Sequence, residues 1–370
     1  MNAKPNISLF LRLALVGGSI LLCCAVVELG WRVYLFHFAC RDHLYKWARL
    51  YDVPREQQLY SEHPYLPYVL SPGYRNAAGT NRVNALGYRG DEITRQKPKG
   101  TYRIVCLGGS TTWGALEDYK LSYPYLLQKD LCERYGHPEV QVVNGGVSGY
   151  TTYESLLNLE LRALDLSPDL ILVYHAVNDA KSRLVPPERY TGDNAGYRRS
   201  LRVHYSFLEH SLFLHYLFVQ WGWSETNSLE RMARRPGVEI PKGASKEEKT
   251  RMLMEVVRKN PPLYFERNLR DIVAVARANG AKVMLTSWAY TTENGGDMAT
   301  PWYRAMVGEH NAISRRLAKQ LGTYFYDFAM QMPPDAKYWK DSMHMSEAGA
   351  PVKADLFARY IANHILSATP

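Results

Sequence analysis

The chain has 370 residues, 46% hydrophobic, 12% aromatic and 22% charged, a composition that excludes a wholly disordered chain, a collagen-like repeat and a disulfide-dense miniprotein. Lys and Arg total 45 against 36 Asp and Glu, which gives a net charge of +9. Because the basic residues are scattered rather than gathered into one arm or helix face, this charge does not favour nucleic-acid binding.

The first element along the chain is an apolar segment, residues 7–27, in which Arg12 is the only charged residue. As a helix this segment would be about 30 Å long, the thickness of a bilayer's hydrocarbon core. We therefore expect a transmembrane anchor within residues 1–30. Arg12 places the N-terminus in the cytoplasm and the rest of the chain in the periplasm or outside the cell. The alternatives are a cleaved signal peptide, although no small-residue cleavage pair follows Val27, and a buried core helix.

Cysteine and histidine spacing favours no metal or cofactor. The five cysteines are Cys23, Cys24, Cys40, Cys106 and Cys132, with no C-x-x-C pair among them. This pattern predicts neither a zinc site nor a disulfide framework. His204, His210 and His215 lie six and five residues apart, which misses the i, i+4 spacing of ligands on one helix face. We expect no metal and no cofactor.

Residues 31–98 are rich in Tyr, Pro and Arg without a sustained period, and we expect an irregular lead-in or stalk packed on a larger domain. Over residues 99–370, short apolar or β-branched runs alternate with segments of helical period. These runs are residues 103–107, 140–144, 170–174, 282–287 and 323–328. The alternation predicts a parallel sheet with helices on both faces.

An insertion of residues 181–262 separates the third and fourth predicted strands. It holds an aromatic stretch and then a charged stretch, and we interpret it as a cap or partner surface, with a solvated helical excursion as the alternative. A last helix is expected over residues 347–366, with Ser346 as its N-cap.

Glycines and polar residues follow three predicted strands, at the sheet edge where ligands bind in folds of this kind. The first strand leads into Gly108-Gly109-Ser110, the second into Asn144-Gly145-Gly146, and the third into His175-Ala176-Val177-Asn178. The loop before the last helix carries Asp341 and His344, three residues apart. Acyl chemistry needs a hydroxyl, a base, a group that orients the base, and donors for an oxyanion. This sequence offers a residue for each.

These four blocks resemble those of the SGNH hydrolases, also called the GDSL esterase and lipase family, over about residues 100–366. The resemblance implies a flavodoxin-like three-layer α/β/α sandwich. It implies Ser110 as nucleophile, His344 as general base and acid, and Asp341 as its orienting partner. It also implies an oxyanion hole formed by the backbone amides of Ser110 and Gly146 and the side chain of Asn178.

Two positions depart from the family pattern. Gly109 stands where the family has aspartate, and Ala176 stands where it has a glycine. The Gly-Gly-Ser-Thr-Thr form, together with residues 84–89, resembles a bacterial branch that is often anchored or exported. Without these blocks, Ser110 would be interpreted as a helix cap and Asn178 as a turn residue.

The functional prediction is a membrane-anchored serine esterase that cleaves an O-acyl ester of a small molecule, lipid or glycan. One alternative is an O-acyltransferase on an exported polysaccharide, since the same three groups serve both reactions. The other is a non-catalytic assembly or binding protein that keeps the fold.

Overall fold

The computed structural model describes residues 7–54, 57–199, 205–224 and 233–367. Its contacts divide the chain into two compact units. The first unit is Met1–Pro54 with Leu201–Met232, and the second is Arg55–Ser200 with Ala233–Pro370. This division differs from the predicted boundaries of 1–30, 31–98 and 99–370. The middle of the predicted 181–262 insertion groups with the N-terminal region, and parts of that insertion and of residues 1–30 lie outside the described residues.

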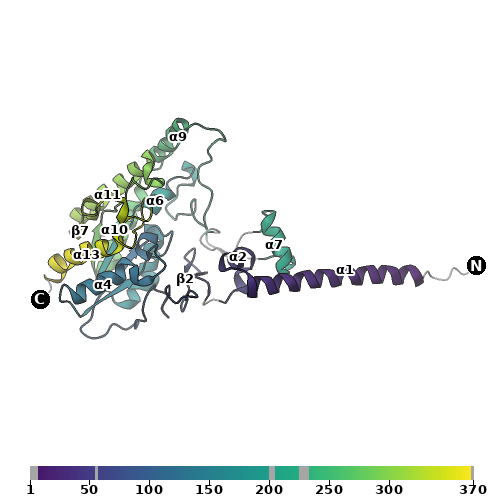
Figure 1. Ribbon diagram of the computed structural model, residues 1–370. Helices are drawn as coiled ribbons and strands as arrows, with labels where there is room; N and C mark the ends of the chain where they lie inside the picture. Colours follow the sequence, from purple (N-terminus) through teal and green to yellow (C-terminus); the bar gives the residue numbers. More distant parts are fainter. Residues whose placement is uncertain (1–6, 55–56, 200–204, 225–232, 368–370) are drawn as a thin grey trace, which may run out of the picture. The chain divides into compact units, whose positions relative to one another are not determined.

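The first unit is built on the long helix α1. This helix, Ile7–Val33, continues as the π-helical turn η1, Tyr34–Phe38. Residues 9–38, which lie in the long helix of Figure 1 and its π-helical turn, are long and apolar enough to cross a membrane. Most of their large apolar side chains are exposed, whereas Leu35 is buried. The unit's other elements are α2 (Arg41–Trp47), η2 (Leu50–Asp52), η8 (Phe207–His210) and α7 (Leu212–Gln220).

The second unit contains a five-stranded parallel sheet. Its strands are β3 (Tyr102–Gly108), β4 (Val140–Asn144), β5 (Leu170–Tyr174), β6 (Lys282–Thr286) and β7 (Tyr324–Tyr326), in the order β4-β3-β5-β6-β7. All five predicted strands are confirmed, the last one shorter at both ends. A short antiparallel pair, β1 (Tyr60–Ser61) with β2 (Val69–Leu70), lies in the lead-in segment.

Successive side chains of each strand point to opposite faces of the sheet. Both faces are apolar, and helices cover each of them, which gives three layers. Ile104 and Cys106 of β3 pack on one side with helices α4 (Tyr123–Glu133) and α13 (Gly349–Ile361). Val105 and Leu107 pack on the other with α5 (Thr152–Asn158), α10 (Leu263–Ala278) and α11 (Pro301–Leu321). The predicted α/β sandwich is confirmed, and Figure 1 shows α4 and α13 close together.

The second unit has further helical elements. They are α3 (Ser110–Trp113), η4 (Tyr119–Leu121), η5 (Leu159–Ala163), η6 (Leu164–Leu166), α6 (Val177–Ser182), η7 (Pro187–Arg189), α9 (Lys246–Lys259), η9 (Asp297–Ala299), α12 (Phe328–Gln331), η10 (Ala336–Tyr338) and η11 (Ala362–Leu366).

The last helix begins later than the sequence pattern predicts. α13 starts at Gly349, two residues after the expected start at Glu347, and reaches Leu366 through η11. Ser346 is not its N-cap residue; Ala348 holds that position. The Ser346 hydroxyl still accepts a hydrogen bond from the backbone N–H of Gly349 at 3.2 Å, so it satisfies one helix donor from outside the helix.

Candidate active site

Three side chains from two distant parts of the chain meet beside the sheet. Ser110 is the first residue of α3, directly after β3, and its Oγ lies 2.8 Å from His344 Nε2. His344 Nδ1 lies 2.8 Å from Asp341 Oδ2. Ser110 and His344 are 234 residues apart in sequence, and the fold brings them within hydrogen-bond distance. The neutral imidazole with its hydrogen on Nδ1 satisfies both contacts: Ser110 donates to Nε2, and Nδ1 donates to Asp341.

Asp341 is fixed by its own loop. Its Oδ1 accepts hydrogen bonds from the backbone N–H groups of Met343 and His344 at 2.8 and 2.9 Å. Partial burial raises the pKa of Asp341, but the hydrogen bonds from the His344 side chain and these two amides outweigh it and lower the pKa to about 2. The carboxyl group is therefore ionised at neutral pH, in the form that holds the imidazole and stabilises a positive charge on it.

Arg89 holds the far end of the helix that carries Ser110. Its guanidinium donates to the carbonyls of Trp113, Gly114, Leu116 and Glu117, at 2.5 to 3.0 Å. Only 4% of Arg89 is exposed. Burial lowers the pKa of this side chain to about 10, which still leaves it charged at neutral pH. The sequence analysis noted residues 84–89 only as part of a family resemblance and missed this role, because the four carbonyls become neighbours only in the folded chain.

Lys353 is the second residue that the sequence analysis missed. It lies on α13, is 1% exposed, and its Nζ donates to the carbonyl of Thr111 at 3.0 Å. The Nζ also lies over the rings of Tyr174 and Tyr123, at 3.7 and 4.2 Å from their centroids. Burial holds the pKa of Lys353 well below its usual range. Thr111, the residue after Ser110, is thus tied to α13 by a buried amine.

Asn178 lies against the turn that leads to Ser110. It is on the first turn of α6, and its Nδ2 donates to the carbonyl of Tyr150 at 2.9 Å. A Cβ on Gly109 would lie 2.4 Å from Asn178 Nδ2 and 3.2 Å from the Tyr150 carbonyl. The glycine that replaces the family's aspartate therefore makes room for the Asn178 carboxamide, whose second N–H stays available to a ligand.

The structure does not support the prediction for Gly146. Its backbone N–H donates to Asn144 Oδ1 at 3.1 Å, so this hydrogen is already engaged within the loop. A Cβ on Gly146 would lie 2.3 Å from the backbone nitrogen of Trp113, so the glycine is required for close packing against α3. The Gly146 amide shapes its own loop, which is why it does not serve as the predicted oxyanion donor.

Gly149 is the better candidate for a backbone donor in this loop. It has a φ of 80°, a conformation that glycine adopts without strain, and directly precedes Tyr150, whose carbonyl contacts Asn178. Within the described part of the chain, no hydrogen-bond acceptor takes up the N–H of Gly149. The sequence contained this glycine in the same block as Gly146, but spacing alone did not distinguish the two.

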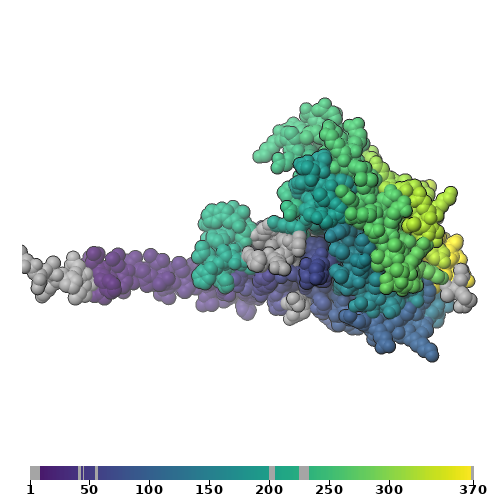
Figure 2. Space-filling model, turned by 180° about the vertical axis from the view of Figure 1, so that it is seen from behind, coloured from purple at the N-terminus to yellow at the C-terminus, as the bar shows by residue number. Residues whose placement is uncertain are grey.

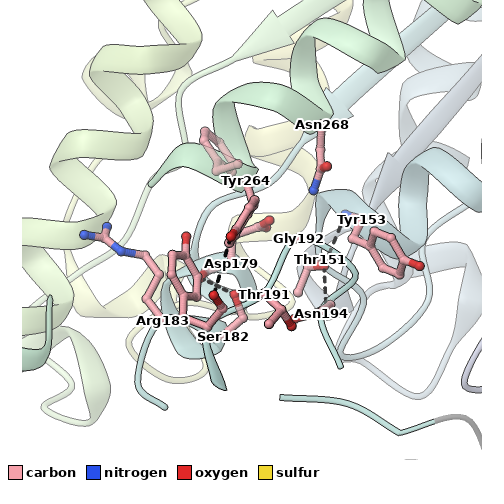
Figure 3. A pocket seen from close by; sticks show the side chains of 12 residues that line it. Thr151, Tyr153, Asp179, Ser182, Arg183, Thr191, Gly192, Asn194, Tyr264 and Asn268 are labelled. Atoms are coloured by element: carbon pink, nitrogen blue, oxygen red, sulfur yellow. Dashed lines mark hydrogen bonds between the residues drawn. The ribbon is translucent and has the colours of Figure 1, made fainter. Parts of the chain in front are cut away.

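Asp179 and Asn268, both labelled in Figure 3, belong to a buried polar network next to Asn178. Asp179 accepts hydrogen bonds from the backbone N–H and the hydroxyl of Thr152 at 3.0 and 2.5 Å. Asn268 of α10 donates to the same hydroxyl at 3.1 Å. Burial raises the pKa of Asp179 to about 7, although the bonds from Thr152 oppose this. The residue next to Asn178 is thus joined to the start of α5, which fixes α6 against the loop that contains Tyr150.

The structure also shows the surroundings of His175 and of the possible metal ligands. His175 is buried, and its Nε2 lies 2.7 Å from the Ser155 hydroxyl. Burial lowers the pKa of His175 to about 3, so its ring is neutral at ordinary pH. Across residues 7–54, 57–199, 205–224 and 233–367, no group of three or more His, Cys, Asp or Glu side chains is placed to hold a metal ion.

The family comparison agrees with this geometry. The model of the GDSL-like lipase/acylhydrolase family matches residues 106–351, more than half of the chain, from within β3 to the start of α13. The chain belongs to this family. It is therefore an ester-hydrolysing enzyme of the GDSL type. Curated proteins provide no match to the chain.

Solved structures with a similar fold include family members at low identity. A lipase/acylhydrolase from Enterococcus faecalis is 16% identical, with 71% of this chain and 96% of that chain covered and a TM-score of 0.43. An acetyl xylan esterase from Geobacillus stearothermophilus is also 16% identical, with 72% and 97% covered and a TM-score of 0.43. Likenesses at this level do not identify a substrate.

Proposed function

We propose that this GDSL hydrolase cleaves an O-acyl ester with Ser110 as nucleophile, His344 as general base and acid, and Asp341 as the group that orients His344. One observation carries the proposal: Ser110 Oγ, His344 and Asp341 form a continuous line of hydrogen bonds, each 2.8 Å long. A hydroxyl is a weak nucleophile unless a base takes its proton as it attacks. His344 lies where that base must be.

In the first half-reaction, Ser110 Oγ forms a bond to the carbonyl carbon of the ester while its proton moves to His344 Nε2. The imidazolium that results is stabilised by ionised Asp341. When the tetrahedral intermediate collapses, the bond to the alcohol oxygen breaks and His344 returns the proton to that oxygen. The products of this half-reaction are the free alcohol and an acyl group on Ser110.

In the second half-reaction, water attacks the acyl carbon and gives its proton to His344. Collapse of this intermediate releases the carboxylic acid and returns the proton to Ser110. In both halves, the negative oxygen is stabilised by the backbone amide of Ser110, the free side-chain N–H of Asn178 and, in place of Gly146, the backbone amide of Gly149. Removal of one such donor typically costs about 10²- to 10³-fold in rate.

The second part of the proposal is anchorage. The apolar helix over residues 9–38 crosses a membrane once, with the N-terminus cytoplasmic and the second unit in the periplasm or outside the cell. Arg12, near the N-terminal end of that helix, supports this direction. The substrate is then an acylated lipid, glycan or small molecule that is reached on that side.

The test is covalent labelling of the full chain in detergent with a fluorophosphonate. We expect stoichiometric labelling at Ser110 and none in Ser110→Ala or His344→Ala, each shown by circular dichroism to be folded. A folded wild-type protein without label would overturn the proposal. Nitrophenyl esters of increasing acyl length, assayed with and without an added sugar alcohol, then define the acyl group and reveal any transfer in place of hydrolysis.

A further inference from the structure

Residues 205–224 of the first unit expose large apolar side chains. Phe207 is 86% exposed, Trp221 56% and Trp223 72%. The segment includes α7, whose sequence from Leu212 to Gln220 contains one histidine, His215, and no Asp, Glu, Lys or Arg. His215 is fully buried, with Nδ1 2.9 Å from Glu209 Oε1. The segment therefore buries Glu209 and His215 while it exposes Phe207, Trp221 and Trp223, the reverse of an ordinary soluble surface.

Glu28 of α1 caps the N-terminus of α7. Its carboxylate accepts hydrogen bonds from the hydroxyl of Ser211 at 2.6 Å and from the backbone N–H groups of Leu212 and Phe213 at 2.9 and 3.0 Å. It also accepts one from Arg32 Nε at 2.6 Å. The first amides of α7 have no partner within their own helix, and Glu28 is a charged residue on an apolar helix. Each group satisfies the other, because the carboxylate of Glu28 accepts hydrogen bonds from those amides.

One face of α7 packs against the end of α1 and the elements that follow it. Leu212, Tyr216 and Val219, spaced as one helical face, pack with Leu35 and Trp47. The Tyr216 ring lies 4.5 Å from that of Trp31 and 4.9 Å from that of Trp47. In Figure 2 this segment, in teal, lies beside the C-terminal part of the purple helix.

The chemistry of the exposed side chains favours one partner. Apolar side chains of α1 and η1 are also exposed in this unit, among them Leu29 at 64% and Phe38 at 77%, and the packing of α7 on these elements places residues 205–224 beside that apolar surface. Tryptophan has a large apolar body and one N–H donor, a combination suited to the zone between lipid headgroups and acyl chains. α7 has no exposed charged side chain and is fixed to α1, so it suits this boundary between headgroups and acyl chains.

We propose that residues 205–224 form a second membrane contact, in which Trp221, Trp223 and Phe207 enter the interfacial layer of a phospholipid bilayer while Glu28 fixes α7 to the anchor. This inference rests on the proposed anchorage through α1. It gives the first unit two attachments to one bilayer, one that crosses it and one that lies in its surface.

The test uses the full chain in vesicles of phosphatidylcholine and phosphatidylglycerol, with dibromo-phosphatidylcholine brominated near the glycerol end of one acyl chain as a quencher. We expect brominated lipid to quench tryptophan emission in the parent protein and this quenching to fall in Trp221→Phe/Trp223→Phe, with the remainder coming from Trp31 of α1. The matched control is Trp302→Phe, which removes a buried tryptophan of the second unit and should keep the quenching.

Three results are informative. Equal quenching in the double variant and the parent would overturn the proposal, as would rings that aqueous acrylamide quenches but brominated lipid does not, because they would face water. Rings shielded from both quenchers would point to a second copy of the chain and would also overturn it. A carbonate wash separates this failure from that of the anchor: a chain that leaves the vesicles lacks the anchor, whereas one that remains tests residues 205–224 alone.

Glu28 provides an independent arm of the same test. We expect Glu28→Ala to lose lipid quenching of Trp221 and Trp223 and to become cleavable by protease near Ser211, because α7 loses its cap. Glu255→Ala, which removes an exposed glutamate paired with Lys259 in the second unit, is the control and should change neither. Unchanged quenching in Glu28→Ala would overturn the role of Glu28.

Discussion

The two units use large apolar side chains in opposite ways. In the second unit, the rings of Tyr174, Phe328 and Phe357 pack against one another at 4.8 to 6.1 Å and are buried in the core. In the first unit, Trp221 and Trp223 are more than half exposed. Among the described residues of the second unit, the exposed large apolar side chains are Tyr65, Leu161, Leu263 and Met330.

The membrane contacts proposed for the first unit account for this difference. A unit surrounded by water buries its apolar residues and leaves charges outside, whereas a unit in contact with lipid can do the reverse. The second unit also buries polar groups, and Arg89 and Asp179 beside the site have hydrogen-bond partners. The comparison therefore predicts that changes in the second unit alter chemistry without altering attachment to the membrane.

The largest effect is expected from Ser110→Ala. Loss of the nucleophile should reduce turnover of a nitrophenyl ester by roughly 10⁴- to 10⁶-fold, because the remaining groups can only assist direct attack by water. Attachment to vesicles should not change, since Ser110 belongs to the second unit. Steady-state kinetics and flotation of the same preparation measure both. If Ser110→Ala protein were released from the vesicles in the flotation assay, the prediction that changes in the second unit leave membrane attachment unaltered would be wrong.

Asn178→Ala should follow, with a loss of about 10²- to 10³-fold in kcat and little change in KM, because the donor acts on the developing oxyanion rather than on the bound ester. Kinetics with a short-chain nitrophenyl ester measures this split. Asn279→Ala, at the exposed C-terminal end of α10, is the matched control and should retain full activity. A loss that appears only in KM would assign Asn178 to substrate binding.

Gly109→Ala should cost activity through Asn178. The new methyl group would stand 2.4 Å from Asn178 Nδ2, so the carboxamide must move, and a displacement of about 1 Å can cost roughly 10²-fold in rate. Gly308→Ala on α11 is the control, because no atom lies within 4 Å of its new methyl group. If Gly109→Ala is as active as wild type, the close approach of Asn178 to this turn has no catalytic value.

The smallest effect is a change of stability with pH, from Asp179. Its folded pKa of about 7 lies above the ordinary value of 3.8, so the folded state binds an extra proton between these pH values. The free energy of unfolding should therefore fall as pH rises from about 4 to 7, by at most about 1.4 kcal/mol per pH unit from this group.

Asp179→Asn should remove this dependence, because asparagine keeps an oxygen acceptor for Thr152 but does not ionise. Urea unfolding of the second unit's transition at several pH values measures it. The control Asp165→Asn removes an exposed carboxylate that pairs with Arg95, and its stability should keep the pH dependence of the parent. Parallel profiles for Asp179→Asn and the parent would contradict the origin assigned here.

Much of the fold could be predicted because its signals are local. A buried strand such as Leu170–Tyr174 is an uninterrupted apolar run, which can be recognised from the sequence alone. The start of the last helix was predicted less well. The sequence pattern favoured Ser346 as the N-cap, whereas the backbone geometry gives that position to Ala348. The predicted domain boundaries also missed that residues 201–232 group with the N-terminal region, because the contact to Glu28 spans about 180 positions.

The sequence by itself determined the order of strands and helices, the apolar helix near the N-terminus, and the presence of Asp341 and His344 in one short loop. These features depend on periodicity and spacing, which neighbouring residues carry. Only the tertiary structure decided that Ser110 Oγ meets His344 Nε2, that the amide of Gly146 is occupied within its own loop, and that Glu28 caps α7. Such contacts depend on how side chains distant in sequence pack together, and no local pattern encodes that packing.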